Sequence, residues 1–229
     1  MIQFDLTTLP EELGDSGLAT ASNAVIVQLY KLKLPNIPNA DPVTGARFPS
    51  LVRIYAQCHL RRLLMFLEGG FYEYNEQRHL LAFAAARSIY ESIATFHDFS
   101  TRLCTLLDEG RFEEATVFLR GRTFATRLPE HLEEDRSNNV TSILTLVQKV
   151  NKKVADFEDA YNRMSEFVHP NAFGSTIHFY TPGKEVATFH DNGKNQTHAL
   201  TYLILASFLS ALFLADVAEI ELRLKNITA

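Results

Sequence analysis

The most regular pattern in this chain lies in residues 138–168, which read NNVTSILTLVQKVNKKVADFEDAYNRMSEFV. Apolar or aromatic side chains recur there at alternating spacings of three and four residues, at Ile143, Val147, Val150, Val154, Phe157, Tyr161, Met164 and Val168. This spacing is typical of a helix that packs lengthwise against another helix. With Asn138 or Asn139 as its cap, the pattern predicts one long helix over residues 138–168.

The composition is that of an ordinary globular protein. Of the 229 residues, 46% are hydrophobic and 21% are charged, which argues against global disorder. The net charge of −5 argues against a general nucleic-acid coat protein, whose affinity comes from neutralising phosphates. Cys58 and Cys104 lie in helical patterns without CxxC spacing, and the acidic N-terminal segment has no basic signal-peptide start. We therefore expect a cytoplasmic protein with reduced thiols.

Four further helices are expected before residue 138, over residues 16–31, 50–67, 75–107 and 112–127. Residues 32–49 carry four of the eight prolines and predict an extended surface connector between the first two of these helices. The pair Gly69-Gly70 is expected to end the second helix, because glycine readily adopts the backbone conformation that follows a helix.

The periodicity changes after residue 170. Residues 176–180 and 185–190 are short β-prone runs around Thr181-Pro182-Gly183-Lys184, a sequence that predicts a type II turn. The last helix is expected over residues 195–225. The chain is therefore predicted to be one all-α domain over residues 1–229, a bundle of long helices with one small β-hairpin at 175–190 before the C-terminal helix.

The C-terminal helix raises the question of a membrane span. Residues 199–215 carry no charge, which reaches the lower edge of a spanning length. Acidic residues follow at once, however, and no aromatic and basic belt flanks the stretch. We predict a buried central helix of the bundle and no membrane contact.

Arg87 and Glu91 are the only charged residues between Leu80 and Phe96. Four residues apart on one helix face, they are expected to pair with each other or with the segment at 161–169. Burying a charge is costly unless it is paired, so the pair either fixes helix register or belongs to a site.

The segment Tyr161-Asn162-Arg163-Met164-Ser165-Glu166-Phe167-Val168-His169-Pro170 carries more polar chemistry than a packing helix needs. Arg163 and His169 point roughly 120° apart on one helix. They can therefore meet only across a dimer, or where Pro170 bends the backbone at His169. The alternative is that His169 stabilises the C-terminal dipole of its own helix.

Two other groups of residues invite a functional interpretation. Glu76-x-x-His79 and Glu166-x-x-His169 have the spacing found in di-iron helical bundles, but further inward glutamates are not evident, so no metal or cofactor is predicted. Arg120-Gly121-Arg122 could contact phosphates, but the basic residues around the fourth helix are interpreted as a solvated face: Arg111, Arg120, Arg122, Arg127 and Arg136.

The form Tyr161-x-x-Met164-Ser165-x-Phe167-Val168-His169, after a helix with Arg87-Ser88-x-x-Glu91, resembles the HEPN superfamily of small helical-bundle proteins. The resemblance covers about residues 75–225 and is closest to uncharacterised bacterial HEPN-like proteins. It implies a homodimer with facing motif helices, and a metal-independent ribonuclease of toxin or phage-defence type. Arg163 would stabilise phosphate charge and His169 would transfer protons, acting on RNA and not on DNA.

Met164 stands where such nucleases favour a polar residue after the arginine. The sequence therefore keeps a second hypothesis open, a non-catalytic dimeric interaction or ligand-binding bundle. In that case Arg87, Glu91, Tyr161, Ser165 and His169 would form a structural polar network. A di-iron bundle is a distant third.

Overall fold

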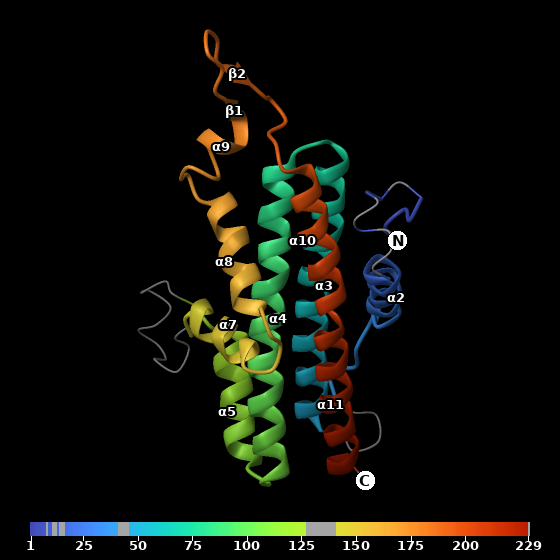
Figure 1. The fold of residues 1–229 in the computed structure, drawn as a ribbon. Helices are drawn as coiled ribbons and strands as arrows, with labels where there is room; N and C mark the ends of the chain where they lie inside the picture. Colours follow the sequence, from blue (N-terminus) through green and yellow to red (C-terminus); the bar gives the residue numbers. More distant parts are fainter. Residues whose placement is uncertain (8, 11–12, 14–16, 41–45, 127–140, 229) are drawn as a thin grey trace.

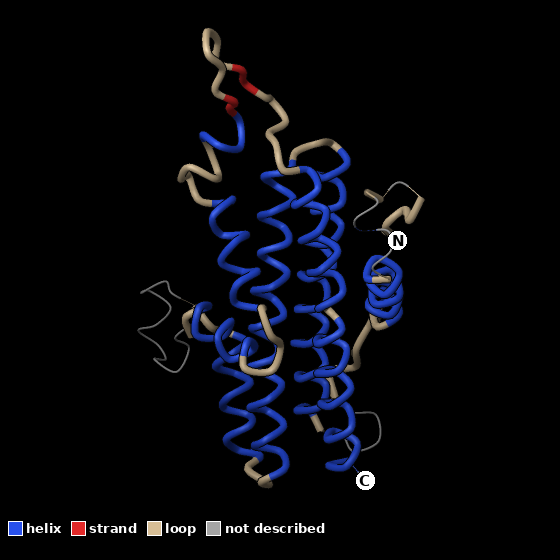
Figure 2. The backbone as a smooth tube through the Cα atoms, in the orientation of Figure 1, coloured by secondary structure: helices blue, strands red, loops and turns tan. Residues whose placement is uncertain are grey.

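The computed structural model describes residues 1–7, 9–10, 13, 17–40, 46–126 and 141–228. Most of these residues belong to helices that run side by side along one axis (Figure 1). The described elements are α2 (Leu18–Lys31), α3 (Arg47–Asn75), α4 (His79–Asp108), α5 (Phe112–Thr123), α7 (Ile143–Asn151), α8 (Phe157–Val168), α9 (Thr176–Phe179), β1 (Tyr180–Thr181), β2 (Thr188–Phe189), α10 (Gln196–Leu209) and α11 (Ala211–Thr228). The predicted all-α class, with a small hairpin before the C-terminal helix, is confirmed (Figure 2).

Helix α4 lies at the centre of the bundle. Eighteen of its 30 residues are buried, and it packs against α3, α5, α7, α8, α10 and α11. Its apolar residues are spread around the helix, as a fully surrounded helix requires. The prediction that the C-terminal helix would hold this central place is wrong.

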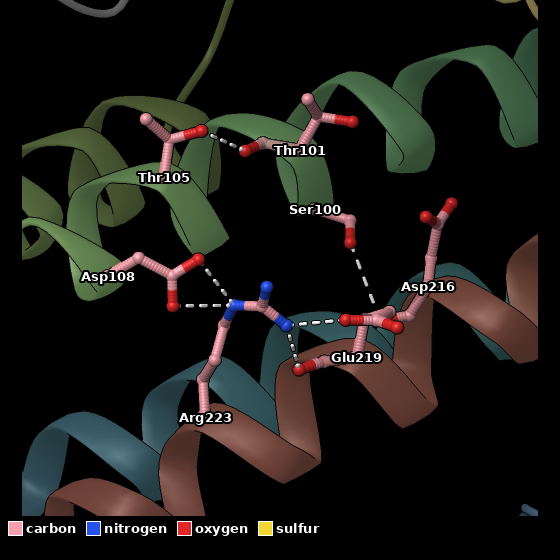
Figure 3. Close-up of polar contacts among 7 residues, drawn as sticks. All are labelled: Ser100, Thr101, Thr105, Asp108, Asp216, Glu219 and Arg223. Carbon is pink, nitrogen blue, oxygen red and sulfur yellow. Dashed lines mark hydrogen bonds and ion pairs between the residues drawn. The ribbon is translucent and has the colours of Figure 1, made fainter.

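The C-terminal segment is divided at Ser210 into α10 and α11. Helix α10 packs against α2, α3 and α4, whereas α11 packs mainly against α4. Figure 3 shows part of that contact, in which Arg223 Nε donates to both carboxylate oxygens of Asp108, at 2.9 and 3.0 Å. Among the described residues, Gln196–Ile227 is the one stretch that is long and apolar enough to cross a membrane, and 44% of its most apolar window is buried in the bundle.

Helix α3 continues through the two glycines that were expected to end it. It runs on to Asn75, so the predicted end at Gly69-Gly70 is wrong. The reason is packing, because a Cβ atom at Gly70 would lie 2.6 Å from Leu203 Cδ2 of α10 and 3.1 Å from Ala85 Cβ of α4. Gly70 thus permits a close approach of three helices.

The predicted helix over 138–168 is two helices in the structure, α7 and α8. Helix α7 ends at Asn151, and the chain turns over residues 152–156. Asp156, whose φ of 62° lies in the left-handed region, directly precedes α8. Figure 1 shows α7 lying across the bundle while α8 runs along α4. The apolar stripe still names the buried side chains correctly, including Val147, Val150, Tyr161 and Met164.

The hairpin is smaller than predicted. Residues 176–179 form the single helical turn α9 instead of a strand, and only Tyr180↔Phe189 and Thr181↔Thr188 pair, in antiparallel register. Gly183 is not among the residues with positive φ, so the predicted type II turn is wrong. Smaller differences concern α2, which begins at Leu18, and α5, which ends at Thr123.

Candidate functional site

Arg87 and Glu91 of α4 form a polar cluster with Tyr161 of α8. Arg87 Nη2 donates a hydrogen bond to Tyr161 Oη at 3.1 Å, and Tyr161 Oη donates to Glu91 Oε1 at 3.0 Å. Arg87 Nε lies 3.4 Å from the same Glu91 oxygen, and the guanidinium carbon lies 5.3 Å from the Tyr161 ring centroid. The predicted pairing of Arg87 and Glu91 with each other and with the 161–169 segment is therefore present.

This cluster is partly shielded from water. The side chains of Arg87 and Glu91 are only 23% and 26% exposed, so most of each side chain is buried. Burial raises the pKa of Tyr161, and the hydrogen bond from Arg87 opposes that rise. Tyr161 therefore remains a neutral phenol at pH 7 and can donate its proton to Glu91. Hydrogen bonds and an ion pair join the three side chains, although the buried Arg87 Nε has no hydrogen-bond partner among the described residues.

Ser165 and Glu166 have local partners. Ser165 Oγ donates to the Tyr161 carbonyl oxygen within α8, at 2.9 Å. The exposed Glu166 accepts a hydrogen bond from Asn171 Nδ2 at 2.6 Å, and Asn171 Oδ1 accepts one from the Gly174 backbone at 3.1 Å. The sequence analysis did not single out Asn171, although it holds the turn that follows α8.

Arg163 and His169 are both exposed, and the structure does not bring them together within one chain. Helix α8 ends at Val168, and His169 has extended backbone angles of −75° and 148°, as expected for a residue before proline. No hydrogen bond or ion pair joins Arg163 to His169 among the described residues. The bend at Pro170 is thus present, but it does not unite the two predicted catalytic residues.

Arg163 shares a groove with a different histidine, His198. It lines a groove of about 330 Å³ that lies between α8, α10 and the segment leading into α9. We term this hollow the α8 groove, and its lining residues are Arg163, Glu166, Phe167, Phe173, Ile177, Asn195, His198 and Tyr202. Burial raises the pKa of Tyr202, while the positive charge of Arg163 acts against that rise. The groove therefore combines one cation, one carboxylate and one imidazole with several aromatic rings.

The sequence analysis missed His198. It lies 29 positions after His169, in the first turns of α10, and its ring centroid is 6.4 Å from that of Phe167. The aromatic residues of 161–173 signalled a packed segment, but nothing local in the sequence connects them to α10. Only the antiparallel return of the chain places His198 beside α8.

A second hollow, which we term the inner cavity, lies between α3, α4, α5 and α7. Its volume is about 570 Å³, and its lining residues are Tyr55, His59, Arg62, Glu91, Ser92, Thr95, Arg122, Ala125, Thr126, Thr141, Ile143 and Leu146. Burial, with help from the charge of Arg62, lowers the pKa of His59 to about 4. His59 is therefore neutral at pH 7, and its buried Nδ1 has no hydrogen-bond partner among the described residues.

The basic residues near α5 do not form a uniform solvated face. Arg122 is largely buried, with a side chain 14% exposed, and it pairs with Asp98 of α4. Lys149 of α7 binds the other oxygen of Asp98 at 2.6 Å. Arg111, by contrast, is an exposed arginine bound to neighbouring glutamates, as predicted. Arg127 and Arg136 lie outside the described residues.

The described part of the chain contains no group of three or more His, Cys, Asp or Glu side chains arranged to hold a metal ion. The two Glu-x-x-His pairs do not assemble there. Glu76 pairs with Arg78, His79 is buried at the start of α4, and Glu166 binds Asn171.

A scan against protein-family models found no match, and searches of curated proteins and of solved structures found none either. The case for function therefore rests on the chemistry of these two hollows and of α8.

Proposed function

We propose that this chain is a HEPN-like protein that binds single-stranded RNA in the α8 groove and cleaves it without a metal ion. The observation that carries the proposal is the lining of this groove, which includes Arg163 together with the aromatic rings of Phe167, Phe173 and Tyr202. Proteins hold single-stranded RNA by pairing cations with phosphates and by stacking bases on aromatic rings. An RNA segment laid across α8 can use both.

The proposed reaction is transesterification within the RNA. A histidine removes the proton from a 2′-hydroxyl, whose oxygen then attacks the adjacent phosphorus. The bond from phosphorus to the 5′-oxygen breaks, and that oxygen receives a proton, which leaves a 2′,3′-cyclic phosphate and a 5′-hydroxyl. Arg163 stabilises the charge that builds on the phosphate oxygens. DNA lacks the 2′-hydroxyl and cannot react in this way.

Two histidines are candidates for the proton transfer. The HEPN resemblance assigns this role to His169, which requires a homodimer, because α8 ends at Val168 and no contact joins His169 to Arg163 among the described residues of one chain. His198 lines the same groove as Arg163 within one chain and needs no partner. We favour His198 for the transfer at the α8 groove, and assign His169 to the facing surface of the proposed cytoplasmic homodimer.

Cleavage of a fluorescent single-stranded RNA in EDTA tests the proposal. Wild type is expected to cleave the RNA and to leave DNA of the same sequence intact. Arg163→Met and His198→Ala should each reduce the rate about a hundredfold or more. His190→Ala is the matched control, since this histidine lies on the hairpin and bonds to Thr181. If only His169→Ala abolishes cleavage, proton transfer belongs to His169 at the interface of the proposed dimer. Cleavage that needs a divalent metal would refute the mechanism.

The second candidate is a non-catalytic dimeric interaction or ligand-binding bundle. The observation in its favour is the cluster of Arg87, Glu91 and Tyr161, in which the Tyr161 hydroxyl accepts from Arg87 and donates to Glu91. A homogeneous dimer that binds RNA but does not cleave it in EDTA or with added metal would select this candidate.

A further inference from the structure

The inner cavity has an excess of positive charge. Among the described residues, the charged groups that line it, together with the groups paired to them, comprise four cations and two carboxylates: Arg62, Arg87, Arg122 and Lys149 against Glu91 and Asp98. Glu91 is matched by Arg87, and Asp98 is shared by Arg122 and Lys149. The excess is therefore two positive charges, which favours an anionic occupant in a hollow partly shielded from water.

Arg62 is the cation best placed to receive such an occupant. It enters the cavity from α3 and lies over the Phe66 ring, with its guanidinium carbon 4.7 Å from the ring centroid. No ion pair of Arg62 occurs within the described part of the chain. Stacking on Phe66 orients the planar guanidinium while its N–H donors remain able to bind an oxyanion.

Arg122 supplies a second set of donors from α5. It binds Asp98, and its Nη1 lies 3.4 Å from Thr141 Oγ1. A guanidinium has five N–H donors, so these two contacts leave capacity for a ligand. Thr95, Thr126 and Thr141 also line the cavity and bring hydroxyl groups suited to oxyanion oxygens.

The rest of the lining is apolar or weakly polar. Tyr55 and His59 lie with ring centroids 4.5 Å apart, and Ile143 and Leu146 come from α7. A cavity of about 570 Å³ falls within the range that holds small organic ligands. Since two cations lie near rings and aliphatic side chains, the matching ligand has a charged end and an apolar body.

We propose that the inner cavity binds a small organic anion whose carboxylate or phosphate is held by Arg62 and Arg122. Its apolar body packs against Tyr55, Ile143 and Leu146. This site lies apart from the α8 groove and does not depend on RNA binding or cleavage. It joins α8 only through Glu91, which lines the cavity and accepts the hydrogen bond of Tyr161.

Isothermal titration calorimetry with four simple probes tests the site. The probes are phenyl phosphate, benzoate, inorganic phosphate and phenol. We expect phenyl phosphate or benzoate to bind more tightly than inorganic phosphate and phenol. Phenyl phosphate and benzoate are the only two probes that have both a charge and a ring. The stronger of the two identifies phosphate or carboxylate as the preferred anion. Binding of phenol as tight as that of both aromatic anions, or no binding of either anion, would overturn the proposal.

Arg61 and Arg62 form a matched pair of variants. Arg61 precedes Arg62 on α3 but turns away, since it bonds to Gln57 and to the Leu34 carbonyl oxygen, each at 2.6 Å. Arg62→Met is expected to weaken binding of the preferred probe about tenfold or more, and Arg61→Met to change it less than about twofold. Equal effects would contradict the assignment. Because Arg62 is exposed, its variant should melt like wild type, and a melting curve checks that the fold is retained.

Discussion

His97 of α4 and Asp216 of α11 form a buried pair, with His97 Nδ1 at 3.0 Å from each carboxylate oxygen of Asp216. Both side chains are 9% exposed. The pair lies close to the Ser100 hydroxyl, which donates to the Asp216 carbonyl oxygen at 3.4 Å (Figure 3). An acidic residue in the C-terminal helix is thus enclosed within the bundle, which supports the prediction that this helix belongs to a folded core.

Replacing His97 alone should be strongly destabilising. His97→Ala leaves the Asp216 carboxylate buried without its partner, at an expected cost of about 3 kcal/mol in the free energy of unfolding. The double variant His97→Phe/Asp216→Leu should recover most of that loss, because it removes both polar groups. Urea unfolding of the two variants measures this difference. A double variant less stable than His97→Ala would show that the pair itself stabilises the fold.

Gly69 and Gly70 should respond in opposite ways to alanine. A Cβ atom at Gly69 meets nothing within 4 Å, so Gly69→Ala should stabilise the protein by up to about 1 kcal/mol through helix propensity. Gly70→Ala places a Cβ atom against Leu203, as described above, and should lower the free energy of unfolding by about 1–3 kcal/mol. Thermal melts of both variants provide the comparison. Equal shifts in the same direction would contradict the close packing of α3 on α10.

The hydroxyl of the buried Tyr161 should contribute to stability. Tyr161→Phe removes one hydrogen bond to Arg87 and one to Glu91, and should lower the free energy of unfolding by about 2 kcal/mol. Tyr202→Phe is a suitable control, since it removes a hydroxyl on α10 outside this cluster. If both variants unfold at the same urea concentration, the cluster contributes nothing specific.

Stability should fall in mild acid because of buried histidines. Burial lowers the pKa of His79 and His178, and lowers that of His59 from 6.5 to about 4. The folded protein keeps these imidazoles neutral, whereas the unfolded chain binds protons near pH 6.5. The contribution to stability is therefore complete above pH 6.5 and declines as the pH is lowered towards 4.

For His59 alone, this loss should be about 1 kcal/mol between pH 6.5 and 5.5. Urea unfolding at these two pH values measures it. His59→Gln should reduce the pH dependence by that amount, and substitution of the exposed His169 by Gln should not. Identical pH dependence in wild type and His59→Gln would count against a neutral buried imidazole.

The sequence predicted which faces of the helices are buried better than it predicted where the helices end. The apolar stripe over 143–168 identified the residues that pack on α4, because burial depends on spacing. The interruption over residues 152–156 includes Asp156 in a left-handed conformation, and the apolar stripe continues through it without a change of spacing. At Gly70 the sequence predicted a helix end where the helix in fact continues. Glycine commonly ends helices, but here it allows close packing between helices.

For the candidate sites too, the sequence predicted local patterns but not contacts between distant segments. Arg87 and Glu91 could be recognised because isolated charges in an apolar helix require partners, and the structure supplies them. His198 and the inner cavity could not be recognised, because their neighbours come from helices far apart in the chain. Arg163 was found from a local motif, but its companion in the α8 groove is a residue on α10.

The most direct test of the central claim is the affinity of single-stranded RNA for the α8 groove, measured by fluorescence anisotropy in EDTA at fixed salt. Arg163→Met should weaken binding about tenfold, because it removes the groove cation. The matched control is Arg102→Met, an exposed arginine that lies over Phe118 and far along α4 from the groove. The account predicts near wild-type affinity for Arg102→Met. Unchanged affinity in Arg163→Met, or an equal loss in both variants, would contradict it.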